Sequence, residues 1–345
     1  MLDKALTHSY DHLFPYIRIE GKTPVPPPEP RAIDVAILDM NHSWPNVGHN
    51  SLVHAVREAS SDMLTLLDAR GLVIRVLSFD VRRSLRVPEP SGRFRLYLGT
   101  GGPGHLDPRR NQGEGEESQG ISEDPSWEAR LFRLFDSIES DPETSLLAVC
   151  HTFGVLCRWK RIADAVMRGE KSSGIPRNVL SPEALAHPWF SRFAAELPDG
   201  RHFHIVDNRL FDLIPTSSGF PAGITPLSFE HDGAPGDAVT MIELARDREG
   251  VMPRILAVNH HPEIVDREHQ LSVLEEKRER GEVSETWYEE RRATFAALLT
   301  GEIERQSRLT SRYTLIEPLR FQLSRLVRER AGQLGAREAE PVESW

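Results

Sequence analysis

Apolar, β-branched runs recur along the first half of the chain, with amphipathic stretches between them. The runs AIDVAILDM (32–40), LVIRVLSFD (72–80), FRLYLG (94–99) and SLLAV (145–149) predict buried parallel strands. Residues 50–69 carry apolar positions three and four residues apart, which predicts a helix that ends near Gly71. Two further helices are predicted over about 126–139 and 153–168. This alternation predicts an α/β fold with a doubly wound, mostly parallel sheet flanked by helices.

The pattern changes toward both ends of the chain. The proline-rich TPVPPPEPR (23–31) predicts an extended lead-in, because proline has no N–H for a helix or a sheet ladder. Short strands are predicted between 200 and 262, in RHFHIV, FDLIP, AVTMIELAR and RILAVN. Charged helical patterns follow. We therefore divide the chain into a lead-in (1–31), an α/β domain (32–265) and a helical C-terminal extension (266–345).

Two segments are harder to place. Residues 105–125 include GEGEESQGISED, which is acidic and without periodicity and predicts an exposed loop. The C-terminal extension carries apolar residues that predict packing on the α/β domain or on a second copy of the chain, and the pattern leaves both open. These residues are Trp287, Tyr288, Phe295, Leu298 and Leu299.

Composition and charge narrow the classes of function. With 39% hydrophobic and 27% charged residues, the chain is typical of a globular protein with a substantial core. Its net charge of −10 argues against nucleic acid as the main partner, since binding phosphates needs clustered Lys and Arg. No apolar run approaches the roughly 18 residues of a membrane span. The N-terminus lacks the pattern of a secretory signal, so we expect a cytoplasmic protein.

The two cysteines are candidate reactive groups. Cys150 ends a short apolar strand and precedes a helix, which would place it at the carboxyl edge of the sheet and near a helix N-terminus that favours thiolate. The alternative is a small buried hydrophobic residue, as we expect for Cys157 in the helix interior. Two turns of helix separate the two residues by about 10 Å, so they would not form a disulfide.

Two other predicted strands are followed by segments that carry candidate catalytic groups. The turn GTGGPG (99–104) can expose backbone N–H groups that stabilise an oxyanion. The segment AVNHHPEIV (257–265) contains His261 and Glu263, a base and a carboxylate suited to orient it. Neighbouring residues of a strand face opposite ways, so only one of His260 and His261 can face Cys150. Elsewhere, His202 and His204 alternate on a strand without further ligands nearby, so we predict no metal site and no cofactor.

The order strand–GGPG, strand–Cys–helix, strand–HPE, over about residues 33–265, resembles the class I glutamine amidotransferases. The resemblance implies a glutamine amidotransferase-like fold over 32–265, with Cys150 as nucleophile, His261 as base and Glu263 as the group that orients it. It also implies an oxyanion hole formed by the turn Gly101, Gly102, Pro103 and Gly104 together with His151, through the backbone N–H groups that this turn and His151 offer. We expect a structural role for the His151 side chain.

The sequence departs from the family at the nucleophile. The family normally has glycine two residues before and after the cysteine, where this chain has Ala148 and Thr152. It usually has glutamine where this chain has Gly154. These departures put glutamine as the substrate in doubt more than they affect the cysteine chemistry.

The resemblance therefore predicts an enzyme that forms a thioester on Cys150 and hydrolyses an amide, releasing or transferring ammonia. A small amide or acyl compound would be the substrate. A synthetase would have to be a separate partner subunit, and a homo-oligomer through the C-terminal helices stays open. Two alternatives remain, an acyltransferase resembling homoserine O-succinyltransferase and a non-catalytic binding protein.

Overall fold

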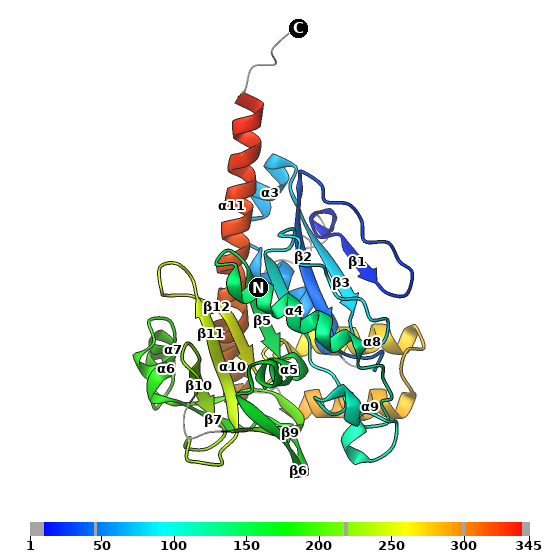
Figure 1. Cartoon of the computed structure of the whole chain (residues 1–345), viewed down its shortest axis with the longest axis vertical. Helices are drawn as coiled ribbons and strands as arrows, with labels where there is room; N and C mark the ends of the chain where they lie inside the picture. Colours follow the sequence, from blue (N-terminus) through cyan, green and yellow to red (C-terminus); the bar gives the residue numbers. More distant parts are fainter. Residues whose placement is uncertain (1–9, 45–46, 217–219, 299–300, 340–345) are drawn as a thin grey trace.

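A ten-stranded sheet runs through the part of the chain that a computed structural model describes, which is residues 10–44, 47–216, 220–298 and 301–339 (Figure 1). Its parallel half has, in spatial order, β1 (Tyr16–Ile19), β3 (Val73–Asp80), β2 (Ala32–Asp39), β4 (Leu96–Gly99), β5 (Ser145–Val149) and β12 (Pro253–Val258). Its antiparallel half continues with β11 (Val239–Arg246), β10 (Thr225–Phe229), β7 (Arg177–Leu180) and β8 (His202–His204).

Different helices cover the two faces of this sheet. Val35 and Ile37 of β2 join one apolar cluster, whereas Ala36 and Leu38 join the other, because successive side chains of a strand point to opposite faces. The first face is covered by α2 (Gly48–Ala59), α3 (Leu64–Arg70) and α11 (Glu317–Ala339), and the second by α4 (Ser126–Ser140) and α5 (His151–Lys160). Burial on both faces explains the continuous apolar runs. The predicted α/β fold class is confirmed.

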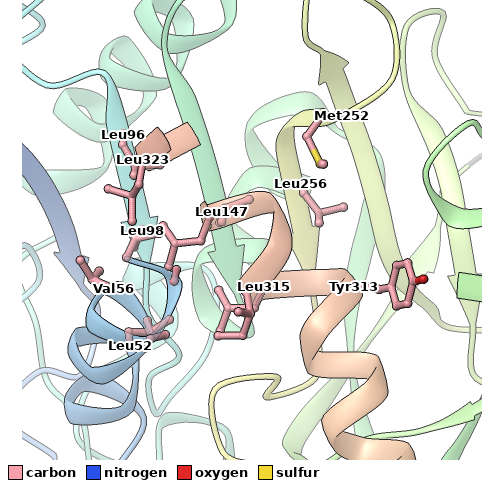
Figure 2. Packing of buried hydrophobic residues seen from close by; sticks show 14 of the residues in the cluster. Leu52, Val56, Leu96, Leu98, Leu147, Met252, Leu256, Tyr313, Leu315 and Leu323 are labelled. Atoms are coloured by element: carbon pink, nitrogen blue, oxygen red, sulfur yellow. The ribbon is translucent and has the colours of Figure 1, made fainter. Parts of the chain in front are cut away.

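The C-terminal extension packs on the α/β domain. Figure 2 shows Leu315, just before α11, and Leu323, within α11, beside Leu98 of β4 and Leu147 of β5. Leu315 belongs to a π-helical turn, η4 (Arg312–Ile316), that leads into α11. In a smaller cluster, Tyr288 and Phe295 pack with Val206 and Ile264 of the α/β domain. This is one of the two arrangements that the sequence left open. Leu299 lies outside the described residues, as does the side chain of Leu298.

The remaining elements are further helices and one two-stranded sheet. The helices are η1 (Asp11–Leu13), η2 (Pro108–Arg110), η3 (Glu116–Ser118), α6 (Pro182–Ala186), α7 (Phe190–Glu196), α8 (Arg267–Glu279), α9 (Glu285–Leu298) and α10 (Gly301–Ser311). The second sheet pairs β6 (Ala163–Gly174) with β9 (Asp207–Pro215) in antiparallel fashion. No helix in the described part of the chain is both long enough and apolar enough to cross a membrane.

Three sequence predictions need correction. The helix predicted over 153–168 ends at Lys160, because Arg161 takes a left-handed conformation (φ 55°) and residues 163–174 instead form β6. The helix predicted over 50–69 is two helices, α2 and α3, and α2 is capped at Ser60, whose hydroxyl donates to the Val56 carbonyl. The segment 105–125 is not simply an exposed loop, since Asn111 and Ser118 in it are fully buried.

Four adjacent parallel strands, β2, β4, β5 and β12, end at the same edge of the sheet. After β2 the chain continues to β3 on one side, and it then returns to β4 on the other side of β2. The crevice at such a reversal, outside the carboxyl ends of the strands, is where open α/β sheets bind ligands. The GGPG turn, Cys150 and the HPE segment follow β4, β5 and β12 in turn.

Candidate active site

Cys150 occupies a sharp turn between β5 and α5. Its backbone has φ 48° and ψ −101°, a left-handed conformation that is unfavourable for a residue with a β-carbon. The turn is fixed from β12, because the Cys150 N–H donates to the Val258 carbonyl at 2.7 Å. The side chain is partly exposed at the N-terminus of α5. Such a strained strand-to-helix turn presents a nucleophile above the sheet edge.

His261 and Glu263 form a buried pair next to Cys150. Nδ1 of His261 lies 2.8 Å from Oε1 of Glu263, and the two side chains are 10% and 1% exposed. Burial lowers the pKa of His261, but the charges of Glu263 and Cys150, and hydrogen bonds to both, raise it more, so the net pKa is well above its ordinary value. The site thus favours imidazolium beside Cys150, which is the state suited to donate a proton.

Gly101 brings the two reactive side chains together. A β-carbon at Gly101 would lie 2.9 Å from Cε1 of His261, 3.3 Å from Cβ of Cys150 and 3.7 Å from its Sγ. The cysteine and the imidazole therefore converge on one backbone position from β5 and β12. Only glycine leaves room for both.

The rest of the GGPG turn packs tightly on the end of β2. The Thr100 hydroxyl accepts from Met40 N–H and donates to the Gly101 carbonyl, each at 2.8 Å. A β-carbon at Gly102 would come within 2.2 Å of the Met40 carbonyl oxygen, so glycine is required there too. These contacts hold the backbone of the turn rigidly beside Cys150.

The five predicted oxyanion-hole residues differ in what they can offer. Within the described part of the chain, the N–H groups of Gly101, Gly102 and His151 have no hydrogen-bond acceptor. The Gly104 N–H instead donates to Oε1 of Gln119 at 2.8 Å. Pro103 has no N–H. The candidate oxyanion donors are therefore the N–H groups of Gly101, Gly102 and His151.

A buried ion pair packs against the GGPG turn. Arg82 donates to Glu123 through two nitrogens at 2.8 and 2.7 Å, and both side chains are fully buried. A third nitrogen of Arg82 donates to the carbonyls of Met40 and Pro103 at 2.9 and 2.7 Å. Glu123 belongs to the segment predicted as an exposed loop, so that segment instead positions the GGPG turn.

The two histidines beside the catalytic candidates have other surroundings. The buried His151 side chain hydrogen bonds to the backbone of Gly102, and burial together with the charge of Arg82 lowers its pKa well below the ordinary value. His260 is buried against Phe203, with 5.8 Å between ring centroids. Burial first, then the charges of His261 and Arg209, lower its pKa to about 3. Both rings are thus held neutral.

Gly154, at the position where the family usually has glutamine, faces Leu106. A β-carbon on Gly154 would lie 2.4 Å from a methyl carbon of Leu106. Leu106 therefore occupies the space that a longer side chain at 154 would need, and it also lines the cavity beside Cys150. This part of the cavity wall is apolar instead of carrying an amide.

A cavity of about 240 Å³ opens onto Cys150 and His261. The turn after β4 forms one wall, and Trp44 and His49 from the segment after β2 contribute to another. Asn46, which lies between these two residues in the sequence, is outside the described residues. Sequence reasoning missed the side of the cavity formed by β6, β9 and α9, which supplies Lys171, Asp207, Arg209, Trp287 and Arg291.

The described residues include no group of three or more His, Cys, Asp or Glu side chains arranged to hold a metal ion. His202 and His204, whose alternation has metal-ligand spacing, have other partners. His202 pairs with Asp199 at 2.7 Å, and His204 with the side-chain oxygen of Gln306 at 2.6 Å.

No protein-family profile and no curated protein matches the chain. Similar solved structures include a glutamine amidotransferase from Thermotoga maritima, with 12% identity, a TM-score of 0.47, and coverage of 86% of this chain and 98% of that one. A second, from Methylobacillus flagellatus, has 12% identity, a TM-score of 0.48, and coverage of 85% and 95%. The glutaminase domain of a Trypanosoma brucei CTPS has 10% identity, a TM-score of 0.43, and coverage of 67% and 86%.

These proteins are of the family that the sequence motifs resemble. At such identities and TM-scores they assign no activity to this chain.

Proposed function

We propose that this chain is a cysteine-dependent amidotransferase-like enzyme that cleaves the amide of a small molecule through a thioester on Cys150. The observation that carries the proposal is the convergence of the Cys150 and His261 side chains on Gly101, with Cys150 in a left-handed turn and Glu263 bonded to the far side of His261. A buried core cysteine needs none of these three features.

The proposed reaction has two steps. The Cys150 thiolate attacks the amide carbonyl, and the N–H groups of Gly101, Gly102 and His151 stabilise the oxyanion. His261 then donates its proton to the departing nitrogen, so that ammonia leaves and a thioester remains. In the second step His261 takes a proton from water, which attacks the thioester and releases the acid and the thiolate. The ammonia would be released or passed to a separate synthetase subunit.

Incubation with a glutamine-directed alkylator tests this proposal. Diazo-oxonorleucine should add one adduct per chain, located on Cys150 by peptide mass, and ammonia should be released from glutamine or a related amide. Cys150→Ser should abolish both. An unlabelled Cys150, together with unchanged cellular function in Cys150→Ala, would overturn the proposal and favour a non-catalytic binding protein.

Two observations favour a second candidate, an acyltransferase. Leu106 fills the space beside Gly154, and helix α9 of the C-terminal extension lines the cavity, so the pocket differs from one expected for glutamine. In that case acyl-CoA should acylate Cys150 where the glutamine analogue does not. Intact mass after incubation with each compound separates the two candidates.

A further inference from the structure

Two cations in the active-site cavity stand outside the ion pairs formed among the described residues. Lys171 on β6 and Arg291 on α9 both line the cavity with Cys150. Within the described residues, neither side chain forms an ion pair, although ion pairs are common elsewhere in the chain. Lys171 is exposed and Arg291 is partly buried, so both can be reached from the cavity.

Each acidic residue of the cavity already has a partner through one of its two carboxylate oxygens. Glu263 bonds to His261 at 2.8 Å. Asp207 accepts from the Ser172 hydroxyl at 2.7 Å and lies 3.4 Å from Nε of Arg209. Among the described residues no other carboxylate lines the cavity, so Lys171 and Arg291 give its wall an excess of positive charge.

The two cations interact with their neighbours in the cavity. The guanidinium of Arg291 stacks over the Trp287 ring, 5.5 Å from its centroid, which fixes its position on α9. Burial and the charge of Arg291 lower the pKa of Lys171, whereas the charge of Cys150 raises it. Lys171 therefore senses both Arg291 and Cys150. Leaving two like charges together in a cavity is unfavourable unless an anion joins them.

We propose that Lys171 and Arg291 bind a negatively charged group of the substrate, a carboxylate or a phosphate, while its carbonyl lies at Cys150. This deepens the proposed function, since it names the substrate class of the same site. It also gives the C-terminal extension a role, because Arg291 and Trp287 come from α9. The substrate class is an amide or acyl compound that carries an anion at the end remote from the reacting carbonyl.

Two alkylating reagents that differ in charge test the proposal on the full chain. Iodoacetate and iodoacetamide both transfer their methylene carbon to the Cys150 sulfur and release iodide, but only iodoacetate is anionic. Cys157 is buried, and burial raises the pKa of its thiol, so it should not compete. The ratio of the two rate constants, from intact mass against time, reports the local charge independently of thiol reactivity.

We expect Lys171→Gln and Arg291→Gln each to lower the iodoacetate-to-iodoacetamide ratio by about three- to tenfold. Molar salt should reduce the wild-type ratio toward that of the variants. Arg292→Gln is the matched control on the same helix, because Arg292 is exposed, pairs with Glu289 and does not line the cavity. Its ratio should equal the wild-type value. Equal ratios in wild type and both cavity variants would overturn the proposal.

A second measurement does not depend on a reactive thiol. The Cys150→Ser protein can be titrated calorimetrically with glutaramate, with inorganic phosphate and with the neutral diamide glutaramide. We expect one of the two anions to bind more tightly than glutaramide. Adding Lys171→Gln or Arg291→Gln should remove this difference in affinity. Glutaramate and phosphate distinguish a carboxylate site from a phosphate site. If neither alkylator modifies Cys150 yet the anion binds, the proposed function fails and this inference stands. If neither anion binds more tightly than glutaramide, the inference fails whatever the thiol does.

Discussion

Thr152 lies against Gly99 so closely that a β-carbon at Gly99 would come within 2.3 Å of Cγ2 of Thr152. Thr152 stands where the family normally has the second glycine of the nucleophile turn. Here the space is supplied by a glycine on the neighbouring strand β4. The Thr152 hydroxyl also donates to the Thr100 carbonyl at 2.8 Å, so it ties the cysteine turn to the GGPG turn.

Substitution of both residues, singly and together, tests this relationship. Gly99→Ala should destabilise the chain by about 1–3 kcal/mol, because the methyl group has no space beside Thr152. In a Thr152→Gly background Gly99→Ala should lower the unfolding free energy much less. The double mutant should therefore be more stable than the sum of the two single effects predicts. Urea unfolding of the four proteins measures it. An equal cost of Gly99→Ala in both backgrounds would show that Thr152 is not the obstacle.

Gly101 offers a test of the active site that leaves its chemical groups intact. Gly101→Ala would place a methyl group between His261 and Cys150, and a displacement of either by about 1 Å should slow modification of Cys150 by about 100-fold. Alkylation by diazo-oxonorleucine measures the rate. Gly332→Ala is the control, because a β-carbon there meets no atom within 4 Å. A wild-type rate in Gly101→Ala would mean that the two side chains do not act together.

The buried pair under the GGPG turn should matter more than surface pairs. Glu123→Gln leaves Arg82 charged and without its partner, so we expect a loss of about 3–5 kcal/mol of unfolding free energy. Glu117→Gln removes the exposed pair with Arg110 in the same segment and should cost less than about 1 kcal/mol. Urea unfolding compares the two. Similar losses would show that Arg82 does not rely on Glu123.

The parallel half of the sheet and the catalytic candidates follow from local sequence. Strands such as β2 and β5 are buried on both faces and so appear as continuous apolar runs. Cys150 directly follows β5 and His261 comes shortly after the end of β12, so both can be predicted from their place behind such a run. The sequence predicts helix over the start of β6 because the residues of this strand are mostly exposed and their apolar positions show no clear periodicity. The sequence analysis does not predict β7 and β10, which are short.

The other wall of the cavity could not be predicted this way. Arg291 lies on a charged helix whose pattern is typical of a solvated surface, and only tertiary packing brings α9 over Cys150. The same holds for Glu123, because an acidic residue in a polar segment gives no sign that it will be buried on Arg82. The exposed-loop prediction failed for this reason.

The pairing of Glu263 with His261 should appear in the pH dependence of stability. The pKa of His261 is raised in the folded chain, so its contribution to stability is fully present below the unfolded pKa of about 6.5 and is lost as pH rises through the folded pKa. Glu263→Gln removes the carboxylate that raises this pKa. We therefore expect a loss of about 3 kcal/mol near pH 6, and a smaller loss at alkaline pH.

Urea unfolding of wild type and Glu263→Gln from about pH 6 to pH 10 measures this difference. Glu268→Gln is a suitable control, since Glu268 lies in the first turn of α8, outside the cavity, and its substitution should change stability little at any pH. A loss in Glu263→Gln that is constant across the range, or that grows with pH, would contradict the pairing of a charged imidazolium with Glu263. In that case His261 would be neutral in the folded chain, and the proton that the proposed reaction gives to the departing nitrogen would have to come from Cys150.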